Sequence, residues 1–297
     1  MAPPWALRIQ DEAPLSLVAM LRGSAWFVPD RGEAIRVEAG DIALVRGPDH
    51  YAFGDDPSTP PQAIIHPDQR CTTPDGKEVG EMRTFGVRRW GNNPDGATEI
   101  LTGTYNVEGE VSRRLLDALP PRLVLRTDEW ETPILGLLAD EMLRDEVGQD
   151  AVLDRLLDLL LVAAVRAHFT RTEDPPGWFR ARNDPVVTHA LRLMQDLPAE
   201  PWTLARLARE THVSRATLAR RFNEVVGQPP IEYLAEWRLT LAADLILDPA
   251  ETIESVAQKV GYSSAYALSA AFKRVRGVRP GQHRAAQRQA LVRSALG

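Results

Sequence analysis

In the first third of the chain, short apolar runs are separated by turn signals. Pro29 to Gly32, Gly40-Asp41 and Gly47-Pro48 are examples of the breaks between them. The apolar or alternating segments cover residues 16–27, 34–37, 42–45, 63–66, 81–90 and 98–105. This spacing predicts the strands of a compact β-barrel or sandwich.

The middle of the chain has the apolar period of a helix. Residues 133–146 and 152–169 carry apolar side chains three and four positions apart, and Gly148 lies between the two segments. We therefore predict a helical hairpin. Its second helix is apolar around much of its girth, so one face is expected to cover the barrel and another to form a dimer interface. Burial within one subunit is the alternative. The interface candidates are Leu153, Leu157, Leu160 and Leu161.

A segment rich in proline, glycine and acidic residues follows the hairpin, between Thr170 and Pro185. Neither a helix nor a strand tolerates such a composition well, so we predict a linker. The chain is then an α+β multidomain protein. Its expected parts are a barrel (1–110), a helical hairpin that dimerises (111–172), a linker (173–184) and an all-α C-terminal domain (185–297).

The C-terminal domain contains an internal repeat. Residues 202–209 resemble residues 251–258, and the matches continue beyond a turn that is one residue longer in the second copy. The later matches pair Ser214 with Ser264, Leu218 with Leu268, Phe222 with Phe272, Gly227 with Gly277 and Pro230 with Pro280. Each copy predicts a helix, a short turn and a second helix.

Polar residues at the expected helix starts support this interpretation. Thr203 and Thr252 are candidate N-caps of the first helices, and Ser214 and either Ser263 or Ser264 are candidates for the second. Two such units joined by the amphipathic segment 231–247 are typical of paired helix-turn-helix motifs. If their second helices lie about 34 Å apart, both can enter one face of a DNA duplex.

The net charge of −6 conceals two halves of opposite sign. Residues 1–180 contain 19 Lys and Arg against 30 Asp and Glu, whereas residues 181–297 contain 16 against 11. No acidic residue follows Glu254, while eight basic residues do: Lys259, Lys273, Arg274, Arg276, Arg279, Arg284, Arg288 and Arg293. A basic C-terminal part indicates a polyanionic partner, and a merely solvated tail is the alternative.

The first residues, Met1 to Trp5, lack the basic and apolar regions of a signal peptide, and Cys71 is the single cysteine. No apolar run approaches the length of a membrane span. We therefore expect a cytoplasmic protein with no membrane partner.

The C-terminal domain contains a set of motifs: Ser214-Arg-Ala-Thr-Leu-Ala-Arg-Arg-Phe222, Gly227-Gln-Pro-Pro230, Trp237-Arg-Leu239, Ala242 to Ile246, Val256-Ala257, Gly261-Tyr-Ser263, Ala271 to Arg274 and Gly277-Val-Arg-Pro-Gly281. On these motifs, residues 184–287 resemble the DNA-binding domain of the AraC/XylS transcription regulators. The resemblance implies that helices at about 214–224 and 264–274 enter successive major grooves of double-stranded DNA. The apolar second helix of the hairpin separately predicts that the protein is a homodimer.

The resemblance also implies which residues meet DNA. Arg220 is the strongest candidate for a base contact, because a guanidinium can bond bidentately to guanine. The family usually has Phe at Leu268 and Arg at Ala270, so the second unit is expected to read bases less strictly. The full set is Ser214, Arg215, Ala216, Ala219, Arg220, Arg221, Ser264, Tyr266, Ser269, Lys273, Arg274 and Arg279.

Residues 17–53 contain Leu21-Arg-Gly23, Gly40-Asp41 and Val45-Arg-Gly-Pro-Asp-His50, and on these motifs they resemble the cupin-type sensor domain of many such regulators. His50, His66 and Cys71 are candidate ligands for a metal ion or an effector, although Ser16 to Met20 stands where a cupin would have paired histidines. A structural His50 is the alternative, and no other cofactor is expected. Arg70 beside Cys71 suggests a redox-active thiol, against a plain half-buried one. A small organic effector among Trp26, Phe27, Tyr51, Phe53 and Trp90 is a further possibility.

These observations favour a transcription regulator that responds to an effector and is not an enzyme. A cupin-like metal-dependent isomerase or oxygenase with a basic appendage is the alternative, and a nonspecific DNA-compacting protein is a third possibility. An activator with RNA polymerase as a partner and a repressor both remain open at this stage.

Overall fold

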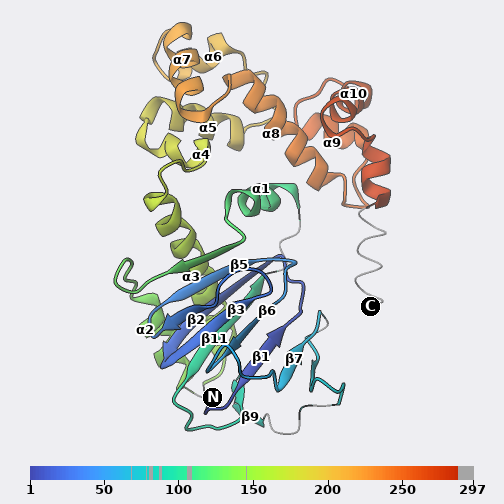
Figure 1. Ribbon diagram of the computed structural model, residues 1–297. Helices are drawn as coiled ribbons and strands as arrows, with labels where there is room; N and C mark the ends of the chain where they lie inside the picture. The colour runs from blue at the N-terminus through green and yellow to red at the C-terminus, as the bar shows by residue number, and fades with distance from the viewer. Residues whose placement is uncertain are drawn as a thin grey trace. The chain divides into compact units, whose positions relative to one another are not determined.

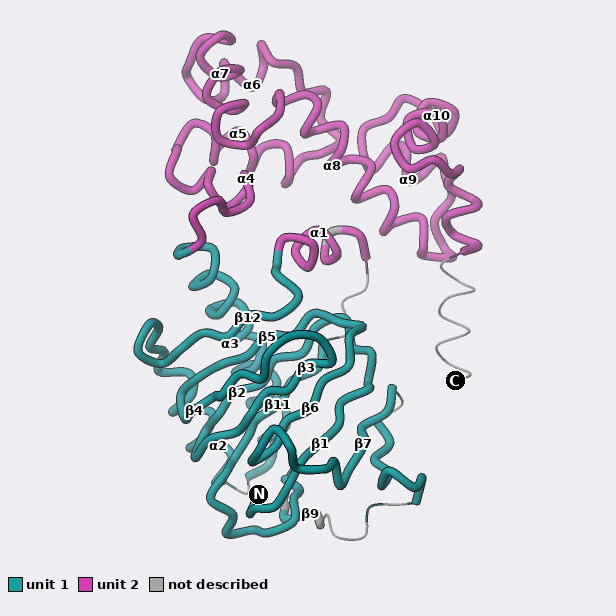
Figure 2. Tube along the Cα trace, in the orientation of Figure 1, with its two compact units in different colours: residues 1–107, 119–171 teal, residues 108–118, 172–297 magenta. Residues whose placement is uncertain are grey.

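The computed structural model describes residues 1–67, 69–77, 79, 83–86, 89–105, 109–144 and 146–286. The chain forms two units (Figure 2). The N-terminal unit contains residues 1–107 and 119–171, and the C-terminal unit contains residues 108–118 and 172–297. A short stretch in the middle of the N-terminal sequence therefore belongs to the C-terminal unit.

The N-terminal unit consists of sheets and a helical hairpin (Figure 1). A six-stranded sheet has the order β4-β3-β6-β1-β7-β8, a four-stranded sheet the order β11-β2-β5-β12, and β9 pairs with β10. The strands are β1 (Ala6–Ile9), β2 (Leu15–Arg22), β3 (Ser24–Pro29), β4 (Ile35–Glu38), β5 (Ile42–Arg46), β6 (Tyr51–Gly54), β7 (Ala63–Ile65), β8 (Cys71–Thr72), β9 (Arg83–Gly86), β10 (Arg89–Gly91), β11 (Glu99–Tyr105) and β12 (Arg122–Leu125).

The two larger sheets share one hydrophobic core. Val18 of β2 and Val45 of β5 pack with the side chains of the six-stranded sheet. At the centre, the ring of Phe27 lies 5.4 Å from that of Tyr51 and 5.3 Å from that of Phe53, measured between centroids. The expected strand-rich cupin-like domain is confirmed, but in the described residues the strands form separate sheets and no closed barrel.

The predicted helical hairpin is present as α2 (Ile134–Met142) and α3 (Gln149–Arg171), with Gly148 at φ +91° before α3. The leucines expected at a dimer interface are covered within the unit instead: Leu153, Leu157 and Leu160 are buried and Leu161 is half-buried. This face of α3 packs on the sheet, since a Cβ at Gly103 of β11 would lie 3.5 Å from Cδ2 of Leu157. None of the described helices is long and apolar enough to cross a membrane.

The C-terminal unit is helical. Its helices are α1 (Glu110–Ala118), α4 (Gly177–Arg180), the 3-10 helix η1 (Ala181–Asn183), α5 (Pro185–Asp196), α6 (Leu204–Glu210), α7 (Arg215–Val226), α8 (Pro230–Leu245), α9 (Ile253–Lys259) and α10 (Ala265–Arg276). The linker expected at 173–184 is therefore partly wrong: α4 and η1 lie within it, and Ala181 is buried in a core. Residues 110–118 are likewise no part of the hairpin.

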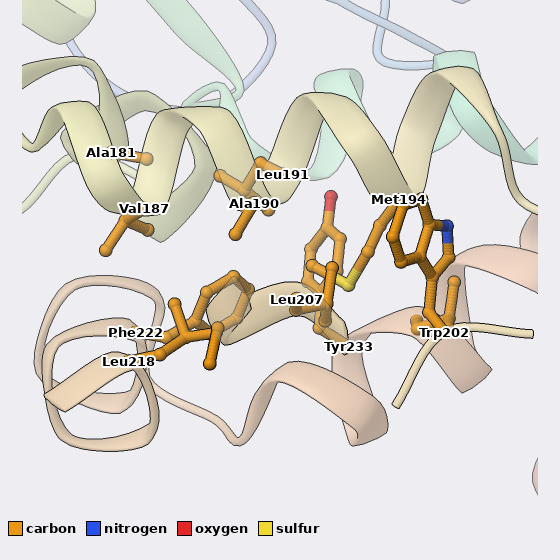
Figure 3. Close-up of a cluster of buried hydrophobic side chains, with 12 residues drawn as sticks. Ala181, Val187, Ala190, Leu191, Met194, Trp202, Leu207, Leu218, Phe222 and Tyr233 are labelled. Carbon is orange, nitrogen blue, oxygen red and sulfur yellow. The ribbon is translucent and has the colours of Figure 1, made fainter. Parts of the chain in front are cut away.

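Two hydrophobic cores hold this unit together. The first gathers Val187, Leu207, Leu218, Phe222 and Tyr233 with their neighbours (Figure 3). The second consists of Leu239, Ala242, Ala243, Ile246, Val256, Ala257, Val260, Leu268, Ala271 and Phe272. Each repeat thus has a core of its own.

A buried carboxylate fixes the turn between β4 and β5. Asp41 is 2% exposed and accepts hydrogen bonds from the backbone N–H of Glu38 (2.9 Å) and of Thr127 (2.9 Å). The guanidinium of Arg126 donates to the same carboxylate at 2.8 Å. Asp41 therefore connects this turn to the chain that follows β12.

We expect Asp41→Ala to lower the free energy of unfolding by about 2–4 kcal/mol, because two backbone donors and Arg126 lose their acceptor in a buried place. Thermal unfolding followed by circular dichroism measures the change. Asp49→Ala, at an exposed site in the next loop, is the control. Equal melting temperatures of the two variants would contradict the role of Asp41.

Candidate nucleic-acid interface

The first helix-turn-helix is built by local sequence signals. The hydroxyl of Thr203 accepts from the N–H of Arg206 at 3.1 Å and starts α6, and the hydroxyl of Ser214 accepts from the N–H of Thr217 at 3.1 Å and starts α7. Gly227 ends α7 at φ +90°, a conformation that favours glycine. The predicted caps are confirmed.

The second unit repeats these signals. Thr252 caps α9 through the N–H of Ser255 at 3.0 Å, and of the two candidate serines Ser264 caps α10 through the N–H of Ala267 at 3.2 Å. In its turn, Gly261 has φ +80°, and a Cβ at this position would lie 2.8 Å from the Ala199 carbonyl oxygen. His212, at the matching position of the first turn, has φ +57°, and the N–H groups of Val213 and Tyr262 bond to Ala208 and Ala257 in the same way. The extra residue of the second turn therefore lies after Tyr262, before the cap Ser264.

Helix α8 connects the two helix-turn-helix units and is held in place along its length. Tyr233 and Leu234 belong to the first core, whereas Ala242 and Ala243 belong to the second. Between them, the guanidinium of Arg238 donates to the backbone oxygens of Pro198 and Glu200, each at 2.8 Å. Among the apolar side chains of this amphipathic helix, Trp237, Leu241 and Leu245 are half-buried. The separation of the two units is set by one supported helix.

The first reading helix, α7, presents a polar face to solvent. Ser214, Arg215, Ala216 and Arg220 are exposed, and Ala219 is half-buried. Arg220 forms a two-point ion pair with Glu224, with Nη1 to Oε distances of 3.0 and 2.9 Å. Such an exposed i,i+4 pair contributes little to stability, so the guanidinium can exchange it for an acceptor on DNA at small cost.

The second reading helix, α10, is less basic at its start. Tyr266 is 84% exposed, and Ser264 and Ser269 are half-buried. The exposed basic residues Lys273 and Arg274 lie in its last turn, and Arg279 is exposed beyond it. The exposed cations of this unit thus gather at the end of α10 and beyond it, and Arg288 and Arg293 lie outside the described residues.

Arg221 differs from its neighbour Arg220. Its Nε donates to the carboxylate of Asp184 at 2.8 Å, and Asp184 also caps α5 through the N–H groups of Val186 and Val187. The Asp184 side chain is 14% exposed. Arg221 thus binds within the unit, and we remove it from the set of expected DNA contacts.

The candidate ligands of the N-terminal unit do not converge. Nε2 of His66 lies 2.8 Å from Oγ1 of Thr72, whereas Nε2 of His50 lies 3.9 Å from Oε1 of Glu12. Over the part of the chain that the structure describes, no three His, Cys, Asp or Glu side chains form a group that would hold a metal ion. Burial raises the pKa of the Cys71 thiol, which is opposite to the lowering expected from Arg70.

The N-terminal unit contains a cavity of about 210 Å³. Of the aromatic candidates, Tyr51, Phe53 and Trp90 line it, whereas Trp26 and Phe27 do not. Charged residues that the sequence analysis missed also line it: Asp11, Arg22, Arg89 and Glu99. Arg89 and Glu99 form an ion pair at 3.6 Å. Arg22, Arg89 and Glu99 lie at the ends of strands, and this position was the sequence signal that could have identified them as lining residues. A cavity that combines apolar walls with a few charges is typical of a small-molecule site.

Known proteins match both units. A cupin family model matches residues 1–170, and a helix-turn-helix domain model matches residues 207–286. A putative AraC-like transcription regulator of Streptomyces lividans is 34% identical over 286 residues, which cover 94% of this chain and 90% of the relative. The HTH-type transcriptional regulator AlkR of Acinetobacter baylyi is 29% identical over 277 residues, or 91% and 87% of the two chains.

Among solved structures, a transcriptional regulator with an AraC-type DNA-binding domain from Chromobacterium violaceum is 30% identical. The match covers 35% of this chain and 94% of that chain, with a TM-score of 0.33.

The ion pair of Arg221 predicts that loss of this side chain lowers stability and leaves base recognition intact. We expect Arg221→Ala to lower the free energy of unfolding of the C-terminal unit by about 1–3 kcal/mol, because the Asp184 carboxylate loses a charged partner. Thermal unfolding measures this loss. The ratio of specific to nonspecific DNA affinity, measured at a temperature where the variant is folded, is expected to stay the same. A reduced ratio with normal stability would restore Arg221 to the DNA contacts.

Proposed function

The chain belongs to the AraC-like transcription regulators and carries an N-terminal cupin domain. From this premise we propose that both helix-turn-helix units read one DNA site. In this proposal the protein is a homodimer, and its cupin domain binds a small effector. The observation that carries the proposal is the pair of reading helices, α7 and α10. They are capped in the same way and connected by α8, which belongs to both cores. Its continuous support favours a fixed spacing between the reading helices.

We assign the two helices different tasks. Arg220 is the proposed base-reading residue, because it is exposed and its present partner is an exposed carboxylate. Arg215, exposed at the start of the same helix, is a second proposed DNA contact. On α10, Tyr266 and Ser269 are the proposed base contacts, while Lys273, Arg274 and Arg279 are proposed to bind phosphates, which position the protein without reading sequence.

We propose an organic effector for the cupin domain. The cavity with its aromatic wall supports this, and the scattered positions of His50, His66 and Cys71 give no support to a resident metal. The known relatives are regulators, which supports a role without catalysis. A regulator of this kind works on the chromosome, so we place it in the cytoplasm; RNA polymerase is its proposed partner if it activates transcription.

The proposed dimer interface is the exposed side of α3. Val152, Leu159 and Val162 are 43%, 51% and 44% exposed and are spaced seven and three residues apart, so they lie along one side of the helix. An exposed apolar stripe on a helix is typical of an interface between subunits. It replaces the buried leucines of the same helix as the site of dimerisation.

Competition binding tests the DNA assignment. The purified protein is titrated with DNA flanking its own gene, with unrelated DNA as competitor, and Arg220→Ala is compared with Arg209→Ala, an exposed arginine on α6. We expect Arg220→Ala to weaken specific binding by about 1–3 kcal/mol, because a bidentate base contact is lost. Arg209→Ala should change it far less.

Equal losses in the two variants would remove Arg220 from base reading. Equal affinity of the unaltered protein for both DNAs would refute sequence-specific binding.

Analytical ultracentrifugation tests the dimer. We expect Leu159→Glu to convert the protein to a monomer, because the substitution would bury a carboxylate without a partner in the interface. Leu197→Glu is the matched control, since Leu197 is 50% exposed but lies in the C-terminal unit. A Leu159→Glu variant that sediments as the unaltered protein does would show that this side of α3 is no interface.

A further inference from the structure

Helix α1 is held within the C-terminal unit by specific polar contacts with α8 and α10. The carboxylate of Glu110 lies 2.5 Å from Nη1 of Arg276 at the end of α10, and the backbone N–H of Glu110 donates to the carboxylate of Asp244 on α8 at 2.5 Å. Gly109 before it has φ +99°, and a Cβ there would lie 3.0–3.1 Å from the carboxylate atoms of Asp244. The chain thus approaches α8 closely at a glycine.

A cavity of about 410 Å³ lies against α1 in the same unit. Its walls come from α1, from α4 and η1, from α5 and from α8. Three aromatic side chains line it, namely Trp178, Tyr233 and Trp237. This volume falls within the range of 300–1,000 Å³ that is usual for small-molecule sites.

The lining is basic. Arg114, Arg182 and Arg192 contribute to it, and among the described residues no acidic side chain does. The guanidinium carbon of Arg114 lies 5.2 Å from the ring centroid of Tyr233, which places this cation at the aromatic wall. Arg192 is exposed at the cavity. An anion is therefore the favoured occupant.

One polar group of the lining is buried without a partner. Nε1 of Trp237 has no hydrogen-bond acceptor in the described part of the protein, whereas the hydroxyl of Tyr233 accepts from Nε2 of Gln195 at 2.7 Å. This nitrogen is itself inaccessible to solvent, so Trp237 meets an occupant of the cavity through the rest of its ring and not through the N–H.

We propose that this cavity is a second small-molecule site, outside the cupin domain, and that it binds a planar aromatic anion. The ring of the ligand packs among Trp178, Tyr233 and Trp237, and its carboxylate is held by Arg192 and Arg114. The site goes beyond the proposed effector of the cupin domain and does not depend on it. Since α1 forms one wall, an occupant also stabilises the packing of α1 on α8. In the sequence, α1 follows β11, and residues of β11 line the cupin cavity.

Fluorine NMR of the full chain tests the proposal. The chain has seven tryptophans, so 5-fluorotryptophan labelling gives one resonance for each, and the resonance missing in Trp237→Phe is that of Trp237. The probes are 2-naphthoate and its neutral analogue 2-naphthamide, titrated to about 5 mM, the range of a weak site. The variants are Arg192→Met and, as the control outside the lining, Arg209→Met.

We expect 2-naphthoate to shift the Trp237 resonance and to bind about tenfold more tightly than 2-naphthamide, because its charge meets the arginines. Arg192→Met should remove most of this preference, and Arg209→Met should keep it. No shift of Trp237, equal binding of the two probes or equal behaviour of the two variants would overturn the proposal. Arg192→Met should retain specific DNA binding, so a failure here is distinct from a failure of the DNA-binding assignment.

Discussion

Helix α8 contributes to two hydrophobic cores at once, and the DNA-binding unit depends on this sharing. The core of each repeat is small, with about a dozen buried residues or fewer, so the residues that α8 adds are a large part of it. Tyr233 and Leu234 complete the first core, and Ala242 and Ala243 complete the second. The same packing that stabilises the repeats therefore sets the separation of their reading helices, so stability and recognition have a common origin.

The neighbouring arginines 220 and 221 show how helix geometry divides similar residues between two roles. Successive residues on a helix point about 100° apart. Arg220 therefore extends into solvent with Glu224, while Arg221 reaches Asp184 at the start of α5. The sequence motif predicts that both arginines contact DNA. The ion pair with Asp184 is what distinguishes Arg221 from Arg220.

Structural features that depend on residues close in sequence could be predicted, and features that depend on tertiary contacts could not. The repeat, its caps and the hairpin around Gly148 depend on residues close in sequence, and all are present. The expected linker contains α4 and η1, because contacts with α7 stabilise a segment whose proline and glycine content suggested a loop. The leucines of α3 were assigned to a dimer because a helix apolar around its girth does not reveal which side meets the sheet.

The most direct test of the account is a hydroxyl-radical footprint of the protein on the DNA upstream of its own gene. Two reading helices at the spacing set by α8 predict, for each subunit, two protected patches about 10 base pairs apart on one face of the duplex. Arg220→Ala should weaken the patch beneath α7 first. A single short patch for each subunit, or uniform protection without a preferred position, would contradict a paired recognition unit.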